Sequence, residues 1–178
     1  MTKKSTSVYP LVANEKIDAD KLVRAKKIIL DLYQELSEKT SNNRSFIAAI
    51  YDGKGKLIAK AANSVVTGNC SLNHAEINVI REAEKILGTY DLSPYHLSLY
   101  TSAKPCIMCV GAIMWSGIKE VYYGVPLECV QKLANEDQGP KINLLDEFKK
   151  RGITVYGGIE VEEGQKIVRL DTAHKKSN

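Results

Sequence analysis

The stretch that decides the fold lies in the middle of the chain and reads Leu97-Ser98-Leu99-Tyr100-Thr101-Ser102-Ala103-Lys104-Pro105-Cys106-Ile107-Met108-Cys109. Its first part, residues 97–101, is typical of a strand. Pro105 suits the first turn of a helix, because the N–H that proline lacks has no partner there. The helix predicted over residues 105–116 is apolar nearly all round, which is typical of a buried helix. A strand that leads into a buried helix indicates an α/β fold.

Further helices and strands alternate on both sides of this stretch. Helices are predicted over residues 20–36, with Asp20 as the cap, and over residues 74–87 and 143–151. Strands are predicted over residues 46–51, 57–62, 120–125 and 153–156, with a turn at residues 52–55 joining the first two. Leu127, Val130 and Leu133 indicate a short helix within residues 126–141. Residues 1–17 are predicted to be irregular, and residues 160–170 fit a strand or a helix.

This order predicts an α/β protein with three layers, α/β/α, around a five-stranded mixed sheet. A helix lies between the fourth and fifth strands, so these two strands are most simply parallel. No repeat or linker divides the chain, and we predict a single domain over residues 1–178. Within it we expect an N-terminal extension and helix (1–40), a catalytic core (46–157) and a C-terminal tail (160–178).

Composition and charge narrow the class of protein. The chain has 178 residues, 44% of them hydrophobic and 26% charged, as in ordinary globular proteins. The net charge of +4 is mild, and part of it lies near the ends, at Lys3, Lys4, Lys175 and Lys176. A dedicated nucleic-acid protein more typically has a clustered basic face. No apolar run reaches the roughly 20 residues that span a bilayer, and no apolar segment follows Met1 as in a signal peptide. We therefore expect a cytoplasmic protein without membrane contact.

Two short motifs together indicate a catalytic zinc site. His74 begins one predicted helix, and Cys106 and Cys109 lie in the first turn of another. Three such ligands leave a fourth tetrahedral position open for water, which is the catalytic arrangement of zinc. Glu76 is two residues from His74, rotated round the helix, and fits better as the acid–base residue beside that water than as a fourth ligand. We predict Zn²⁺ as the cofactor.

Three other interpretations remain open for these residues. Asn73-His74-Ala75-Glu76 also resembles a capping box, in which Glu76 would bond to the backbone. Cys70 is near enough in sequence to complete a closed, structural zinc site. The chain could also be a zinc-stabilised structural subunit of a larger assembly, although such a site has no need of Glu76.

Beyond these motifs, residues 46–156 resemble the cytidine deaminase superfamily, in the branch that uses His-Ala-Glu. The run Gly111-Ala112-Ile113-Met114-Trp115, followed by Val121-Tyr122-Tyr123, most resembles bacterial guanine deaminases, whereas residues 77–81 resemble the purine-acting members and the tRNA adenosine deaminases equally. The resemblance implies a cytidine-deaminase-like fold and a homodimer with sites near the interface. It implies that Asn63 holds the substrate ring and that Lys104, where relatives carry glutamate, acts through its backbone carbonyl. We also assign Ala75 and Trp115 to the substrate site, Trp115 as an apolar wall.

The resulting prediction is a zinc-dependent hydrolytic deaminase. It acts on a free nucleobase or nucleoside, a purine of guanine type, and releases ammonia by attack of a zinc-bound water. The alternatives within enzymes are a tRNA adenosine deaminase and a cytosine deaminase. The expected partners are this small molecule and a second copy of the chain, not nucleic acid.

Overall fold

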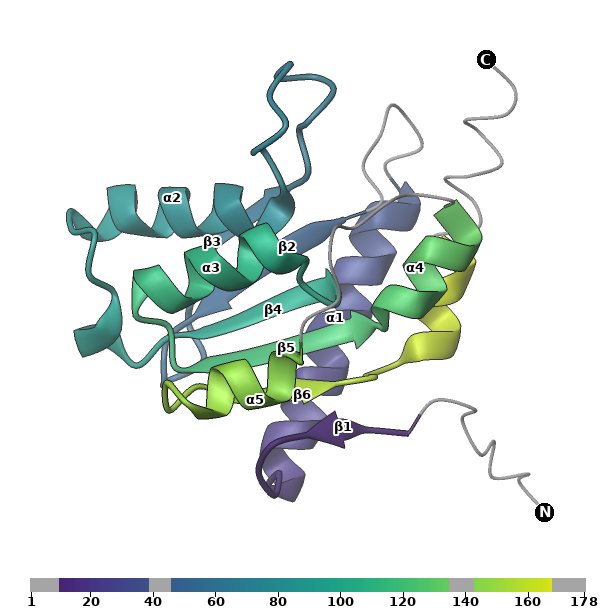
Figure 1. The fold of residues 1–178 in the computed structure, drawn as a ribbon, viewed down its shortest axis with the longest axis horizontal. Helices are drawn as coiled ribbons and strands as arrows, with labels where there is room; N and C mark the ends of the chain where they lie inside the picture. Colours follow the sequence, from purple (N-terminus) through teal and green to yellow (C-terminus); the bar gives the residue numbers. More distant parts are fainter. Residues whose placement is uncertain (1–9, 39–45, 135–142, 168–178) are drawn as a thin grey trace.

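A six-stranded mixed sheet forms the centre of the protein (Figure 1). The computed structural model describes residues 10–38, 46–134 and 143–167. The strand order across the sheet is β1-β6-β5-β4-β2-β3. The bounds of the strands are Val12–Ala13 (β1), Ile47–Tyr51 (β2), Leu57–Ala62 (β3), Ser98–Ala103 (β4), Glu120–Val125 (β5) and Thr154–Gly157 (β6).

The strand directions agree with the predicted mixed sheet. Strands β2 and β3 form the expected antiparallel hairpin, and β2 also pairs antiparallel with β4. Strands β4, β5 and β6 are parallel, which confirms the predicted parallel pair at the end of the chain. The prediction of five strands is wrong, because β1 adds a sixth, antiparallel to β6. A two-residue strand is too short to show any periodicity, so its segment was expected to be irregular.

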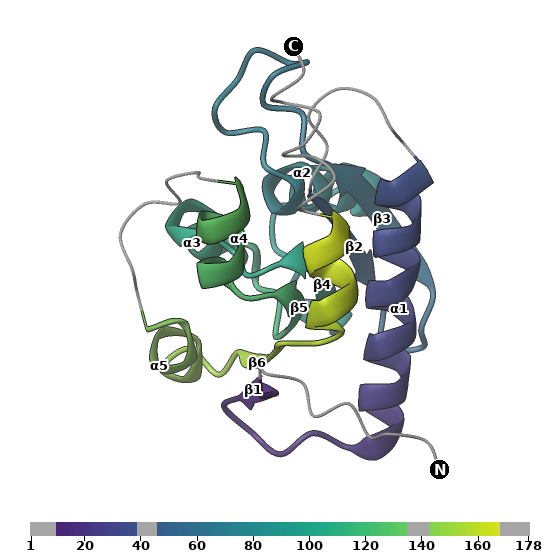
Figure 2. The ribbon, with the colours of Figure 1, turned by 90° about the vertical axis from the view of Figure 1, so that its right-hand side faces the viewer.

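The helices lie on both faces of the sheet, in the predicted three layers (Figure 2). Their bounds are Ala19–Glu38 (α1), Ala75–Leu87 (α2), Ile107–Ser116 (α3), Leu127–Ala134 (α4) and Leu144–Lys149 (α5). A short 3₁₀ helix, η1, covers Ser93–Tyr95, and residues 161–167 are also helical. The short helix predicted within residues 126–141 is therefore confirmed as α4, while residues 135–142 and 168–178 lie outside the described residues.

Strand β2 shows how one sequence serves two cores. Ile47 and Ala49 belong to the core beneath α1, whereas Ala48 and Ile50 belong to the core beneath α2, α3 and α5. Successive side chains of a strand point to opposite faces, so a strand buried on both faces must be apolar throughout. The two cores hold the helices firmly against the sheet.

The helix ends follow the sequence at most places. Gly88 and Gly117 end α2 and α3 as predicted, both in the left-handed conformation that favours glycine (φ 68° and 85°). The cap of α1 differs from the prediction. Asp18, not Asp20, precedes the helix, and its carboxylate accepts the backbone N–H of Asp20 at 2.9 Å. The helix begins before the first residue of its apolar stripe, so the residue that caps it also lies earlier in the chain than predicted.

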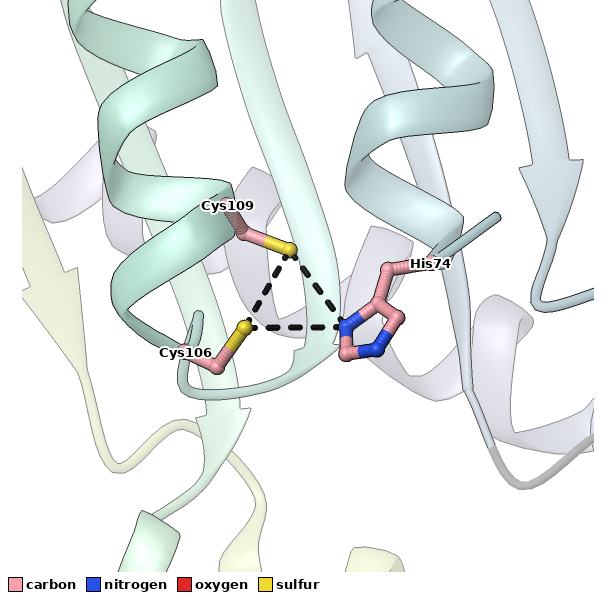
Figure 3. A group of neighbouring side chains, drawn as sticks. All are labelled: His74, Cys106 and Cys109. Carbon is pink, nitrogen blue, oxygen red and sulfur yellow. Dashed lines mark hydrogen bonds between the residues drawn. The ribbon is translucent and has the colours of Figure 1, made fainter. Parts of the chain in front are cut away.

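The connections place two helix starts at one end of the sheet. Helix α2 precedes β4 in the chain and α3 follows it, and the two helices lie side by side on the same face (Figure 1). Their N-termini both lie near the C-terminal end of β4 (Figure 3). Crevices at the carboxyl ends of parallel strands are where α/β proteins bind ligands. No helix within the described residues is long and apolar enough to cross a membrane.

Candidate active site

His74 is the residue immediately before α2. Its backbone is extended (φ −66°, ψ 154°), and its side chain makes no capping hydrogen bond to the helix. The imidazole is thus not used to cap the helix, and it points away from the axis toward the start of α3 (Figure 3).

Cys106 and Cys109 belong to the start of α3. Cys106 is the N-cap, and Cys109 lies three residues on, so both side chains share one face of the first turn. A hydrogen bond with Cys109, together with the contact with His74, outweighs burial and lowers the pKa of Cys106 to about 4. The hydrogen bond to Cys106 and burial raise the pKa of Cys109. The thiolate character at Cys106 suits a metal ligand, because thiolates and not thiols bind metals.

The three side chains form a nearly equilateral triangle (Figure 3). The two Sγ atoms lie 3.7 Å apart, and each lies 3.6 Å from His74 Nδ1. A tetrahedral zinc ion, with bonds of about 2.3 Å to sulfur and about 2.0 Å to nitrogen, spaces two sulfur ligands at about 3.8 Å and a sulfur and a nitrogen ligand at about 3.5 Å. The residues therefore fit zinc both in donor type and in spacing. The three predicted ligands thus come together as a group that could hold a metal ion.

Cys70 does not join this group. The described residues hold one cluster of potential metal ligands, and it contains His74, Cys106 and Cys109 without Cys70. All the described cysteines are free of disulfides. The closed four-ligand site that Cys70 would complete is thus not formed, and the three ligands leave the fourth position open.

Glu76 is fully enclosed beside the metal ligands. Its side chain is 6% exposed, and one carboxylate oxygen lies 3.4 Å from Cys109 Sγ. Thr101 Oγ1 donates a hydrogen bond of 3.0 Å to the other oxygen. Burial raises the pKa of Glu76, and the hydrogen bonds from its own backbone N–H and from Thr101 oppose part of that rise. A buried carboxylate held this close to an open metal site is poised for proton transfer.

The capping-box interpretation does not hold in this structure. A capping box needs Asn73 as the N-cap and Glu76 as the third helical residue. The N-cap is His74, which makes Glu76 the second helical residue. Its carboxylate bonds to Thr101 and Cys109 from other elements instead of reaching back to Asn73.

The residues predicted to bind substrate are arranged around this centre in part. Ala75 follows His74 and is completely buried. Lys104 directly precedes Pro105 and donates its backbone N–H to Val125 at 2.8 Å. Asn63 lies at the end of β3, where its Oδ1 accepts the backbone N–H of Val65 at 2.9 Å. Their contact with a substrate remains a prediction.

Trp115 lies elsewhere. It is near the C-terminal end of α3, about 13 Å along the helix axis from Cys106 at 1.5 Å per residue. Its side chain is 91% exposed. The apolar wall predicted from Trp115 is therefore not formed within one chain. The prediction of a helix buried all round is also wrong, since Ile107 is 41% exposed on the same helix. The apolar side chains that α3 exposes in a single chain therefore need an explanation other than burial in the core.

Two residues of the site were missed by sequence reasoning. Thr101 was assigned only to a strand, although its position shortly before Pro105 places it at the strand end that faces the metal. Asn78 was noted only within a motif. It lies four residues after His74, hence on the same side of α2, and this spacing could have revealed it.

The chain belongs to a known family. The sequence pattern described as the cytidine and deoxycytidylate deaminase zinc-binding region matches residues 23–125, which is more than half of the chain. The matched segment contains the three metal ligands and Glu76. The protein is thus a member of this zinc-binding deaminase family.

Sequence relatives include two kinds of enzyme. The guanine deaminase of Bacillus subtilis is 48% identical over 69 residues, which cover 39% of this chain and 43% of that protein. The tRNA-specific adenosine deaminase of the same organism is 36% identical over 120 residues, which cover 66% of this chain and 70% of that protein. The chain matches about half the length of several of these relatives.

Solved structures extend the similarity to nearly the whole chain. The guanine deaminase from Nitrosomonas europaea has a TM-score of 0.78 and 29% identity, covering 89% of this chain and 94% of that one. A structure in complex with 2,6-diaminopurine has a TM-score of 0.79 and 29% identity, covering 90% and 93%. The fold is thus that of zinc-dependent nucleobase deaminases.

Proposed function

We propose that this protein is a hydrolytic deaminase of a free nucleobase or nucleoside, and that the substrate is a purine of guanine type. One observation carries the proposal. The carboxylate of Glu76 lies buried at 3.4 Å from a ligand of a three-residue metal site, and it bonds to Thr101 and Cys109 of other elements. A structural zinc site does not need such a group, so this arrangement favours an enzyme over a zinc-stabilised subunit.

The chain's own residues can divide the reaction into proton-assisted steps. His74, Cys106 and Cys109 would hold zinc, which when bound lowers the pKa of a water molecule toward neutrality and makes it a nucleophile. Glu76 would accept a proton from the attacking water and pass it to a ring nitrogen. It would then take the proton of the added hydroxyl group and deliver it to the departing amine, which leaves as ammonia. Thr101 holds one oxygen of Glu76 and leaves the other directed at the site. The products are the hydroxylated ring and ammonia.

Asn63 is the residue proposed to orient the ring. Its Oδ1 is already occupied by the N–H of Val65. Its Nδ2 group remains a donor, and the structure records no partner for it among the described residues. The O6 and N7 atoms of guanine are both acceptors. A donor at Asn63 therefore suits a ring of this kind, with Ala75 and the carbonyl of Lys104 proposed as further contacts.

The choice of a guanine-type base rests on the length of the structural match. The related structures that cover about nine-tenths of the chain include a guanine deaminase and a complex with 2,6-diaminopurine. Relatives that act on tRNA keep that substrate as the main alternative, and cytosine is a further one. The mild charge favours a small substrate, because gripping several phosphates requires a clustered basic surface.

Release of ammonia from a panel of substrates tests the proposal. The panel holds guanine, guanosine, adenine, cytosine, cytidine, pterins and a tRNA anticodon stem-loop. We expect guanine or a close purine analogue to be deaminated, with rates that change little between low and moderate salt. Deamination of the stem-loop alone, with activity that collapses as salt rises, would transfer the proposal to the tRNA alternative.

We further propose that the protein works as a homodimer in the cytoplasm. The exposed apolar face of α3, defined by Ile107, Gly111 and Trp115, supports the dimer. These residues are spaced four apart and share one side of the helix. Apart from the adjacent residues and backbone of its own helix, no described atom lies within 4 Å of where a side chain at Gly111 would begin. A second copy of the chain would cover this face.

A further inference from the structure

A single asparagine side chain joins the two segments that carry His74 and Asn63. Asn78 lies on α2 and is partly buried. Its Nδ2 lies 3.0 Å from the carbonyl oxygen of Ala62, 3.0 Å from Ser64 Oγ and 3.2 Å from the carbonyl oxygen of Asn73. Ala62 and Ser64 flank Asn63, and Asn73 directly precedes His74. One amide thus contacts both segments of the proposed site.

The backbone around Asn78 is closed by further hydrogen bonds. Ser64 N–H donates to the carbonyl of Asn73 at 2.9 Å, which closes the loop over residues 65–72 at its base. Asn63 N–H donates to the carbonyl of Phe46, the residue directly before β2, at 2.9 Å. We call the paired segments 62–64 and 73–74 the neck of this loop. Asn78 is the side chain that spans the neck from the helix side.

The loop itself folds tightly onto the neck. A Cβ at Gly68 would lie 2.6 Å from Asn73 Nδ2 and 2.9 Å from the carbonyl oxygen of Ser64. This approach leaves no room for a side chain at position 68. The neck is therefore packed from the loop side and hydrogen-bonded from the helix side, which favours a fixed separation between its two segments.

We propose that Asn78 is a positioning residue, which fixes Asn63 relative to His74 by spanning the neck. The inference rests on the proposed function in one respect, namely that Asn63 binds the substrate ring. The contacts of the Asn78 amide nitrogen are all with the neck. The effect of Asn78 on the reaction is carried by Asn63, so losing it should weaken substrate binding while the chemistry of a bound substrate continues.

Kinetics of Asn78→Leu test this role, since leucine has a similar size and no donor. We expect KM for the deaminated base to rise about tenfold, the loss corresponding to one well-placed hydrogen bond, with kcat changed less than about threefold. Asn78→Ser keeps one donor on a smaller side chain, so its KM should lie between those of the unmodified protein and Asn78→Leu. Zinc content should stay at the level of the unmodified protein in both variants.

A double-mutant cycle separates positioning from a general loss of stability. In an Asn63→Ala background, Asn78→Leu should change KM by less than about twofold, because the residue through which it acts is gone. A tenfold rise in both backgrounds would overturn the proposal.

The matched control is Asn14→Leu. Asn14 likewise bridges two segments through its amide, donating to the carbonyl of Ile153 at 2.9 Å and accepting the N–H of Val155 at 3.0 Å, but it joins the end of β1 to β6. It should lower the melting temperature and leave KM unchanged.

Amide hydrogen exchange gives a readout that needs no substrate. In Asn78→Leu, the amide protons of Ser64 and Val65 should exchange at least about tenfold faster, since the neck opens more readily. Asn14→Leu should leave these two amides unchanged. If exchange is faster in Asn78→Leu but the unmodified protein has no deaminase activity, the proposed function is refuted and the role of Asn78 in holding the neck is supported. Unchanged exchange in both Asn78→Leu and Asn78→Ser would refute the role of Asn78 whatever the substrate.

Discussion

At the scale of single residues, Glu76 is the group on which the proposed chemistry depends. Glu76→Gln keeps the shape of the side chain and its contact with Thr101, but it cannot accept a proton. We expect deamination to fall by about 10²–10⁴-fold, the range of general acid–base contributions. Circular dichroism and zinc content should remain normal. Near-normal turnover in a folded, zinc-loaded Glu76→Gln protein would falsify the catalytic role.

Thr101 holds the carboxylate of Glu76 in place, so its hydroxyl should matter separately. Thr101→Val keeps the branched shape in a completely buried position and removes only the donor. A hydrogen bond to a charged group contributes about 1.5–3 kcal/mol, and we expect kcat to fall by about ten- to a hundredfold. Thr101→Ser restores the hydroxyl and should recover most of the rate. Equal losses in the valine and serine variants would indicate that packing, not the hydrogen bond, is at stake.

The site residues that sequence could predict are those whose chemistry is unusual. His74, Cys106 and Cys109 are uncommon residues at ligand spacing, so their pairing with helix starts predicted the metal site. Thr101 and Asn78 are common polar residues whose role depends on which backbone oxygen or carboxylate lies opposite. That information appears only when the chain is folded.

At the scale of elements, the metal should join α2 to α3. We expect the purified protein to contain about one zinc ion per chain, as a single three-ligand site requires. Cys109→Ala should lose the zinc and melt at a lower temperature, because a metal that binds only the folded state stabilises it. Cys70→Ser serves as the control and should keep the zinc content and the melting temperature of the unmodified protein. Metal analysis that finds no zinc, with a disulfide between Cys106 and Cys109, would contradict the metal site.

An ion pair joins α1 to the sheet and gives a pH dependence with a definite sign. Lys21 of α1 bonds to Glu120 of β5, which also accepts Ser98 Oγ at 2.8 Å. Burial alone would raise the pKa of Glu120, but the hydrogen bonds from Lys21 and Ser98 hold its pKa below the ordinary 4.5. A lowered carboxyl pKa contributes stability above the unfolded value, and this contribution is lost as pH falls through the folded value.

Glu120→Gln is therefore expected to lower the free energy of unfolding at pH 7 by about 1 kcal/mol, a modest figure because water screens the partly exposed pair. The difference from the unmodified protein should shrink as pH falls below 4.5 and then through the lower pKa of the folded state, below which Glu120 is protonated in both states. Urea unfolding at a series of pH values measures this. A difference that is constant from pH 7 to pH 3 would show that the carboxylate charge plays no part.

Element boundaries show which local signals are reliable. Gly88 and Gly117 predicted the ends of α2 and α3 correctly, because the left-handed conformation there favours glycine. Asp18 and Asp20 are chemically equal candidates for the cap of α1, and only the path of the preceding chain decides between them. Residues 12 and 13 form strand β1 because they pair with the edge strand β6, which is distant in sequence.

At the scale of the whole molecule, the layers were predictable and the outer surface was not. Alternating strands and helices with the correct periodicity predicted the α/β/α order and the parallel strands, since each element must bury its apolar face. The apolar helix α3 was expected to be buried within the chain. Instead it covers the sheet with one side and exposes Ile107 and Trp115 on the other. A helix that is apolar on every side is expected to be covered on every side, but the sequence does not say which atoms cover it.

The last prediction concerns that exposed face. If a second copy of the chain covers Ile107, Gly111 and Trp115, the protein should sediment as a dimer at micromolar concentration, because exposed apolar patches of this kind mark association sites. Trp115→Glu places a charge in the contact and should shift the protein to a monomer with its circular dichroism unchanged. The control is Val23→Glu, which places the same charge on another exposed apolar position, 67% exposed on α1. Val23→Glu should remain dimeric, because α1 lies on the opposite face of the sheet. A native protein that is monomeric throughout, or a Trp115→Glu variant that stays dimeric, would show that this face has another partner or none.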